Sequence, residues 1–259
     1  MLSITFDSVY LYMVVLMRVA GVITFNPILT QRGVPFRIRA GLTALLTIIT
    51  VPTMTAAAPD LDYGSWFFLA TLLKELFIGF LFSYVIGLFY YLLIGIGEVM
   101  DTQFGMSMSK IFDPGTNLQM GITDKILSFF FVMYFFLTNS HLYLIKTMVE
   151  SYNVVPAGVP VLNLAAVSNF CVVLLVSTFS LVVRLTFPFI AAHFVLQICL
   201  GILMKLIPQI HIFVLNIDMK ILLTILMLLV MTPSIANFID AALGPMFTSI
   251  ENALYYVGS

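Results

Sequence analysis

Residues 65–96 read SWFFLATLLKELFIGFLFSYVIGLFYYLLIGI, and this stretch decides the fold class of the chain. It is apolar almost throughout, contains no proline, and is longer than the roughly 20 residues that a helix needs to cross a bilayer. It therefore predicts one long membrane helix. Five further apolar blocks lie on either side of it, at about residues 9–28, 38–58, 125–149, 165–206 and 211–239.

The composition indicates the same class for the whole chain. Of its 259 residues, 61% are hydrophobic and 9% are charged, whereas a soluble domain usually has about a quarter charged residues. We therefore expect an all-α, polytopic membrane protein with about six long or kinked hydrophobic helices. Short connectors and the lack of an evident repeat favour a single integral-membrane domain over residues 1–259. The net charge of −1 argues against a nucleic-acid partner, which requires a basic face.

The helix count and the topology depend on a few residues. Pro188 lies in the block at 165–206, so that block predicts either one long bent helix or a helical hairpin. No basic region precedes the first block, which we interpret as a retained helix and not as a cleaved signal peptide. The positive-inside rule puts both termini outside and residues 97–121 on the cytoplasmic side. The basic residues behind this topology are Arg32, Arg37, Arg39, Lys110, Lys125 and Lys205.

A polar segment interrupts the apolar pattern at residues 97–121, which read GEVMDTQFGMSMSKIFDPGTNLQMG. Its glycines allow tight turns, and its methionines can fill an irregular gap and repack. Such a segment suits a movable plug in a channel better than a rigid catalytic site. A surface loop with a few buried anchors explains the same composition equally well.

Charged residues also lie inside or beside the apolar blocks: Arg18, Lys74, Glu75, Arg184, Asp218 and Lys220. A charge at the bilayer centre costs on the order of 3 kcal/mol on insertion scales. These groups should therefore face protein, water or one another. A path for protons or ions is one interpretation. The favoured one is that they form structural pairs within a helical bundle, or lie beyond the true helix ends.

Small residues recur along one face of the helix predicted at 65–96. Gly79, Ser83 and Gly87 are spaced by four residues, and Gly95 falls on the same face. This spacing lets another helix approach closely. Motifs of zinc hydrolases, serine hydrolases and nucleotide-binding loops are missing from the sequence. We therefore predict no catalytic residue, no metal and no cofactor.

The order and spacing of many residues resemble the FliR family of flagellar export-gate proteins, which is related to the SctT proteins of type III injectisomes. The GMSMSKIFDPGTNLQ run at 105–119 favours the flagellar branch. The other matching positions are Arg18, Pro27, Pro35, Lys74, Glu75, Gly79, Gly97, Asp101, His141, Pro156, Gly158, Pro188, Pro208, Gln209, Phe213 and Lys220. The sequence departs from the family pattern at His211, Asn216 and Asp218, so the turn before the last helix is expected to differ.

The resemblance implies a FliP-like and a FliQ-like helical unit joined in one chain. One copy would assemble with FliP-like and FliQ-like subunits, and with FlhB-like and FlhA-like export components, in the bacterial inner membrane within the flagellar basal body. The assembly would form a pore for unfolded flagellar protein substrates. In the family, the loop that corresponds to residues 103–119 plugs the closed pore. The carried-over plug residues are Phe104, Met106, Met108, Ile111, Phe112, Asp113, Pro114 and Gly115.

Two other functions remain as alternatives. One is an export-gate subunit of an injectisome, of the SctT type. The other is a stand-alone secondary transporter in which Arg18, Glu75 and Arg184 form a site at the membrane midplane. Transporters of that kind usually contain internal repeats with broken helices, and the lack of a repeat in this sequence argues against it.

Overall fold

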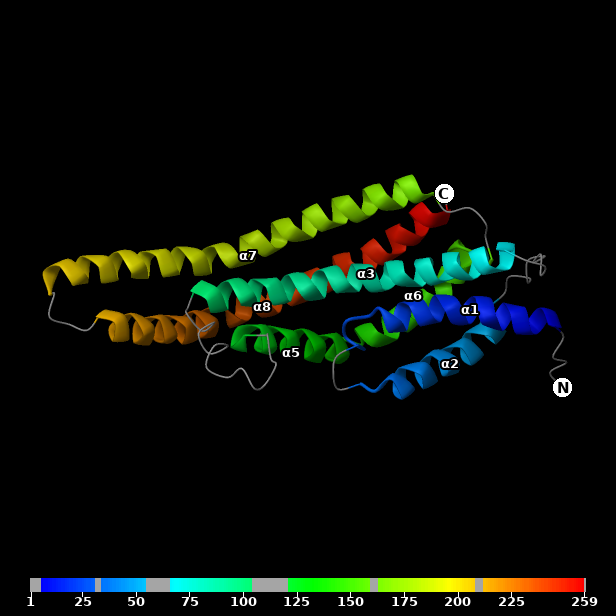
Figure 1. Ribbon diagram of the computed structural model, residues 1–259, viewed down its shortest axis with the longest axis horizontal. Helices are drawn as coiled ribbons and strands as arrows, with labels where there is room; N and C mark the ends of the chain where they lie inside the picture. Colours follow the sequence, from blue (N-terminus) through cyan, green and yellow to red (C-terminus); the bar gives the residue numbers. More distant parts are fainter. Residues whose placement is uncertain are drawn as a thin grey trace. The chain divides into compact units, whose positions relative to one another are not determined.

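The computed structural model describes residues 6–30, 34–54, 66–103, 121–158, 163–207 and 212–258. All regular structure in these ranges is helical (Figure 1), which confirms the predicted all-α class. The helices are α1 (Phe6–Thr24), α2 (Phe36–Thr53), α3 (Trp66–Gln103), α5 (Ile122–Leu137), α6 (Ser140–Val154), α7 (Leu164–Leu206) and α8 (Ile212–Gly258).

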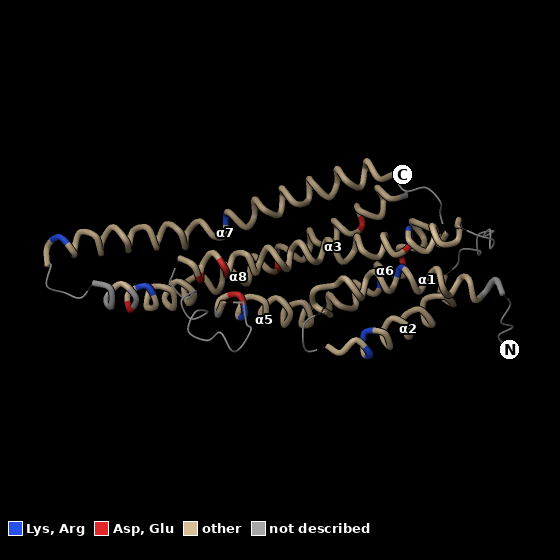
Figure 2. The backbone as a smooth tube through the Cα atoms, viewed as in Figure 1, with Lys and Arg blue, Asp and Glu red and all other residues tan. Residues whose placement is uncertain are grey.

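Four of these helices are long and apolar enough to cross a membrane, and α5 with α6 could form a fifth, bent span. Charged residues are sparse along all of them (Figure 2). The chain is a polytopic membrane protein, as the composition predicted. The number of helices differs slightly from the expected six, because one apolar block divides and its two parts are separate elements.

The division occurs in the block at 125–149, which forms α5 and α6 with a bend of 66° between them. Asn139 lies at the bend with a positive φ of 57°. Asparagine tolerates this left-handed conformation better than most residues, so the helix can end and restart there. Hydropathy does not detect the bend because apolar residues continue on both sides of it.

The other long blocks form continuous helices. α3 includes the predicted stretch 65–96 almost entirely and continues to Gln103, into the polar segment. α7 is one helix with Pro188 inside it, so of the two interpretations the single helix is correct and the hairpin is not. α8 continues to Gly258, well beyond the predicted end at residue 239. In its last part, buried residues recur at helical spacing and form one face among exposed residues. An average of hydropathy along the chain does not detect a one-sided apolar face.

The chain folds into two compact units, and α3, α7 and α8 each contribute to both. The first unit contains the described parts of residues 1–89, 135–175 and 243–259, and the second those of 90–134 and 176–242. In the first unit, α1 and α2 lie side by side (Figure 1). The interpretation of residues 1–259 as one membrane domain stays a prediction.

Candidate functional site

A buried ion pair joins α1 to α3 in the first unit. Arg18 on α1 is fully buried, and its Nε donates a hydrogen bond of 2.6 Å to Oε2 of Glu75 on α3. The guanidinium also donates to Ser151 Oγ at 3.1 Å and to the Val155 carbonyl oxygen at 3.0 Å. α6 and the turn after it therefore supply the remaining acceptors for the charge of α1.

The surroundings of the pair are equally complete. The Tyr152 ring lies 4.1 Å from the Arg18 Cζ, a cation–π distance. The Gly158 backbone N–H donates to Glu75 Oε1 at 2.8 Å, and Gly158 has a φ of 82° that favours glycine. Both oxygens of Glu75 are thus engaged. The cluster connects three helices, α1, α3 and α6, and each nitrogen of Arg18 has an acceptor within it.

The other predicted charges lie in different surroundings. Lys74 on α3 is half-buried, and Lys220 on α8 is also half-buried. Arg184 lies in the middle of α7 and is exposed. Arg184 belongs to the second unit, whereas Arg18 and Glu75 belong to the first. Their functional roles stay predictions.

The predicted small-residue face of α3 approaches α1 closely in the first unit. A methyl group at Gly79 would lie 2.8 Å from the Gly21 Cα of α1, so no side chain fits there. Ser83 Oγ donates to the carbonyl oxygens of Gly21 and Val22, at 3.1 and 2.8 Å. Gly87 is buried, whereas a methyl group at Gly95 would meet nothing within 4 Å. The small-residue face is therefore packed against α1 at Gly79 and open at Gly95.

The predicted plug residues lie outside the described residues. They are Phe104, Met106, Met108, Ile111, Phe112, Asp113, Pro114 and Gly115. The structure describes both ends of the segment that contains them, because α3 ends at Gln103 and the chain resumes at Gly121 before α5.

Hydrogen bonds join these two ends directly. Asp101, on the last turn of α3, is fully buried and accepts a hydrogen bond of 2.5 Å from Thr123 Oγ1. The Thr123 backbone N–H also donates to the same carboxylate, at 3.2 and 3.3 Å to its two oxygens. Asp101 thereby provides an acceptor for one of the first N–H groups of α5, which have no partner within their own helix.

A second carboxylate completes this arrangement. Asp124 Oδ2 accepts a hydrogen bond of 2.8 Å from the Gly121 N–H. An acidic residue at helix position N3 makes the same bond to the N-cap N–H in a capping box. A methyl group at Gly97 would lie 2.8 Å from the Asp124 Cα, and one at Gly121 would lie 2.6 Å from the Asp101 Cγ. We call Gly97, Asp101, Gly121, Thr123 and Asp124 the loop clamp.

The sequence indicated only part of the loop clamp. Gly97, Asp101 and Gly121 lie at the ends of the polar segment that it singled out, but Thr123 and Asp124 fall outside that segment. The G-x-x-D pattern of residues 121–124 could have indicated a helix start, since it resembles half of a capping box. The capping of α5 by α3 is a tertiary contact and has no such local signal.

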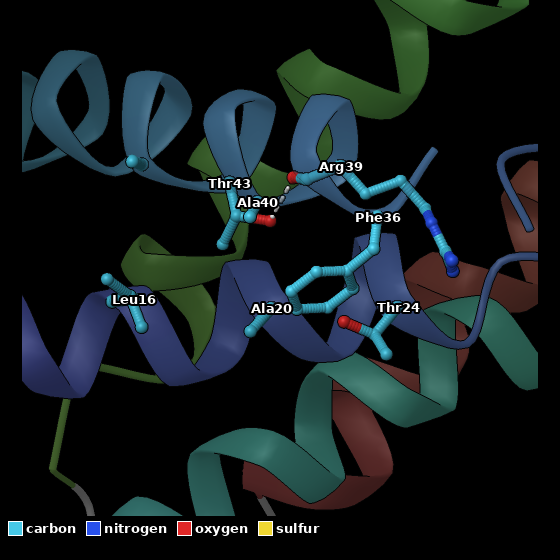
Figure 3. Close-up of a pocket in the computed structure, with 8 residues that line it drawn as sticks. Leu16, Ala20, Thr24, Phe36, Arg39, Ala40 and Thr43 are labelled. Carbon is cyan, nitrogen blue, oxygen red and sulfur yellow. Dashed lines mark hydrogen bonds between the residues drawn. The ribbon is translucent and has the colours of Figure 1, made fainter. Parts of the chain in front are cut away.

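A groove lies between α1 and α2 (Figure 3), with a volume of about 260 Å³. The Phe36 ring lies between the two helices, and Thr43 Oγ1 donates to the Arg39 carbonyl oxygen at 2.8 Å. The lining residues are Leu16, Ala20, Thr24, Phe36, Arg39, Ala40, Thr43 and Ala44. In the sequence, Arg39 indicated only the membrane topology, and no sequence pattern indicated the groove.

Comparison with known protein families shows that the sequence of this chain is related to export proteins. The sequence model of the family "Bacterial export proteins, family 1" matches residues 9–246. The chain belongs to this family. It is a family of export proteins and not one of enzymes, and its match includes both the Arg18 cluster and the loop clamp.

The relatives that match most of this chain include flagellar proteins named FliR and a protein named SpaR. "Flagellar biosynthetic protein FliR" of Escherichia coli K12 is 27% identical over 94% of this chain and 92% of its own length. The protein of the same name from Bacillus subtilis is 22% identical over 95% of each chain. "Surface presentation of antigens protein SpaR" of Shigella flexneri is 22% identical over 90% of this chain and 91% of its own. These matches confirm the resemblance stated from the sequence.

Proposed function

We propose that this chain is a non-enzymatic subunit of the flagellar type III protein export gate. It forms, with FliP-like and FliQ-like subunits, the channel for unfolded flagellar proteins. The family match over residues 9–246 supports the export role, and the relatives named FliR support the flagellar branch. The gate lies in the bacterial inner membrane within the flagellar basal body, beside FlhB-like and FlhA-like components.

The 103–119 loop plugs the pore of the closed gate. The observation that carries this proposal is the loop clamp, which holds the two ends of the segment together through Asp101 and Thr123. A segment fixed at both ends can shift as one unit while the helices on either side stay in place. Its methionines suit a contact that must close and reopen, because their side chains are flexible and polarizable.

An injectisome gate of the SctT type is the alternative that the relatives support, since SpaR matches over most of the chain. The higher identity to a FliR of Escherichia coli favours the flagellar branch. A stand-alone transporter is less well supported. Arg18 and Glu75 neutralise each other, and every nitrogen of Arg18 and every carboxylate oxygen of Glu75 has a hydrogen-bond partner within the chain, which argues against a binding site for a charged substrate at that position.

Co-expression tests the assembly part of the proposal. The chain is expressed with FliP-like and FliQ-like proteins from the same bacterium and purified through a tag on this chain alone. We expect a stable complex that contains one copy of this chain, measured by native mass spectrometry. A tagged monomer or homodimer that retains neither partner would contradict the proposal, provided that each partner is present in the membrane fraction.

A further inference from the structure

The groove between α1 and α2 has an apolar end and a charged end (Figure 3). Leu16 lies at the apolar end, and the small side chains of Ala20 and Ala40 leave room along the middle. The Arg39 guanidinium lies at the other end, beyond the Phe36 ring. Both helices belong to the first unit. The groove is therefore amphipathic along its length.

The direction of the groove matches that of a lipid in a membrane. Its charged end lies where α1 ends at Thr24 and α2 begins at Phe36. Leu16 comes eight residues before Thr24 in α1, which at 1.5 Å per residue is about 12 Å along the helix. The positive-inside rule places the turn between the two helices at the cytoplasmic surface. The groove then runs from the headgroup region toward the membrane interior, as an acyl chain does.

Arg39 lacks a counter-charge within the first unit. Its Nε is buried and has no hydrogen-bond partner among the described residues. No acidic residue occurs between Asp7 and Asp60, which lie at or beyond the far ends of α1 and α2. The other carboxylates described in this unit have partners on α1 or α6, and they belong to Glu75, Glu150 and Glu251. An anion from outside the unit would supply the missing acceptor.

The two ends of the groove together match an anionic phospholipid. A guanidinium presents its N–H groups as a planar fork that suits two oxygens of one phosphate. Arg37 adds a second positive charge in the first turn of α2, which contains no acidic residue. Basic pockets between membrane helices on the cytoplasmic side bind anionic lipid headgroups. A free phosphate would occupy the charged end and leave the apolar part empty, whereas a phospholipid fills both.

We propose that the groove between α1 and α2 binds one molecule of an anionic phospholipid. One acyl chain lies between Ala20 and Ala40 and extends toward Leu16. The phosphate accepts hydrogen bonds from the Arg39 guanidinium. All these residues belong to the first unit, so the inference depends neither on the plug role of the 103–119 loop nor on the export role.

The test is photo-crosslinking to lipid. The tagged chain is purified from cells that express every gate subunit, together with the subunits that it retains, and placed in phosphatidylcholine nanodiscs. A trace of phosphatidylglycerol carries a photoreactive group in one acyl chain, and labelled peptides are identified by mass spectrometry. We expect labels within residues 16–24 and 36–44, several times stronger than with an equally photoreactive phosphatidylcholine. Equal labelling by the two lipids, or none at these residues, would overturn the proposal.

Two arginine variants test the headgroup contact. Arg39→Gln should lower the labelling by about tenfold, the effect of one hydrogen bond to a charged group, and Arg39→Lys should keep part of it. Arg37→Gln is the matched control, because it removes the same charge from the same helical turn but does not line the groove. It should keep at least half of the labelling. An equal loss in Arg37→Gln and Arg39→Gln would mean general attraction to positive charge, and would overturn the site.

Filling the groove tests the position of the acyl chain. Ala40 is exposed, so Ala40→Trp should fold normally and keep the unfolding temperature of the wild type. Its indole would occupy the space beside Ala20, and we expect the labels within residues 16–24 to disappear while Arg39 is unchanged. Undiminished labelling of the folded Ala40→Trp chain would show that the lipid lies elsewhere, and would overturn the proposal.

Discussion

Arg18 and Glu75 show how a charged residue can be stable inside an apolar chain. Each has an oppositely charged partner, and every nitrogen of Arg18 and every carboxylate oxygen of Glu75 has a hydrogen-bond partner. Buried pairs of this kind contribute little net stability, but breaking one is costly because a bare charge remains. The sequence indicated both residues and favoured a structural pair. It could not identify Ser151 or Tyr152, which approach Arg18 only through tertiary packing.

Glu75→Gln tests the pair directly. It leaves the Arg18 guanidinium buried without a counter-charge, so we expect a loss of about 3–5 kcal/mol of stability, measured by thermal unfolding of the purified gate. The matched control is Glu150→Gln, because Glu150 pairs with Lys146 at 3.7 Å on an exposed surface. That change should stay within about 0.5 kcal/mol. Equal effects of the two variants would show that the Arg18 pair is not structural.

The reversed pair gives a second, sharper result. Arg18→Glu combined with Glu75→Arg restores opposite charges but not the hydrogen bonds, since the Val155 carbonyl would then face an acceptor and the Gly158 N–H would face a donor. The double variant should therefore remain at least as unstable as Glu75→Gln. Recovery of the wild-type unfolding temperature would mean that charge alone stabilises the site.

At the scale of elements, length and composition predicted the helices well where apolar residues are continuous. α3 and α7 are the clearest cases. The bend at Asn139 was not predictable from hydropathy, because it depends on one backbone conformation within an apolar run. The small-residue face of α3 was recognised from its spacing, but the identity of the partner, α1 at Gly21, required the structure.

Gly79→Ala and Gly95→Ala make a matched pair within one helix. The first methyl group would meet the backbone of α1, whereas the second would meet nothing within 4 Å. We expect Gly79→Ala to cost about 1–3 kcal/mol or more, as overpacking does, and to reduce the yield of folded gate. Gly95→Ala should leave the unfolding temperature of the isolated chain unchanged or higher. If instead Gly95→Ala blocks only assembly, then the open end of this face contacts another subunit.

The loop clamp joins two elements, and its removal should release the ends of the loop and loosen the first turn of α5, while the rest of both helices stays intact. Asp101→Ala removes the acceptor for Thr123, and Gly121→Ala places a methyl group against Asp101. Both should raise the permeability of the membrane to ions in cells with the complete gate, while the subunits still co-purify. Gly201→Ala is the control, because its methyl group would meet nothing within 4 Å. Intact gates that stay closed in both clamp variants would show that the clamp does not hold the plug.

At the scale of the whole molecule, the family was recognisable from residues spread along the chain, and the match to bacterial export proteins confirms it. The sequence could not provide the division into two compact units, since each unit is assembled from segments far apart in the chain. The loop clamp lies where α3 and α5 meet at the ends of the polar segment. This position supports the central claim, that the segment between Gln103 and Gly121 closes an export pore.

The measurement that tests this claim most directly is ion leakage after removal of residues 106–117 from the chain in an otherwise complete gate. Leakage is followed by the collapse of the membrane potential and by the uptake of a small, normally excluded dye. The control replaces the same residues with a Gly/Ser segment of equal length, which keeps the connection but removes the apolar side chains. We predict that both variants assemble and leak, with the deletion leaking more. An assembled gate that lacks residues 106–117 and remains as impermeable as the wild type would contradict the account.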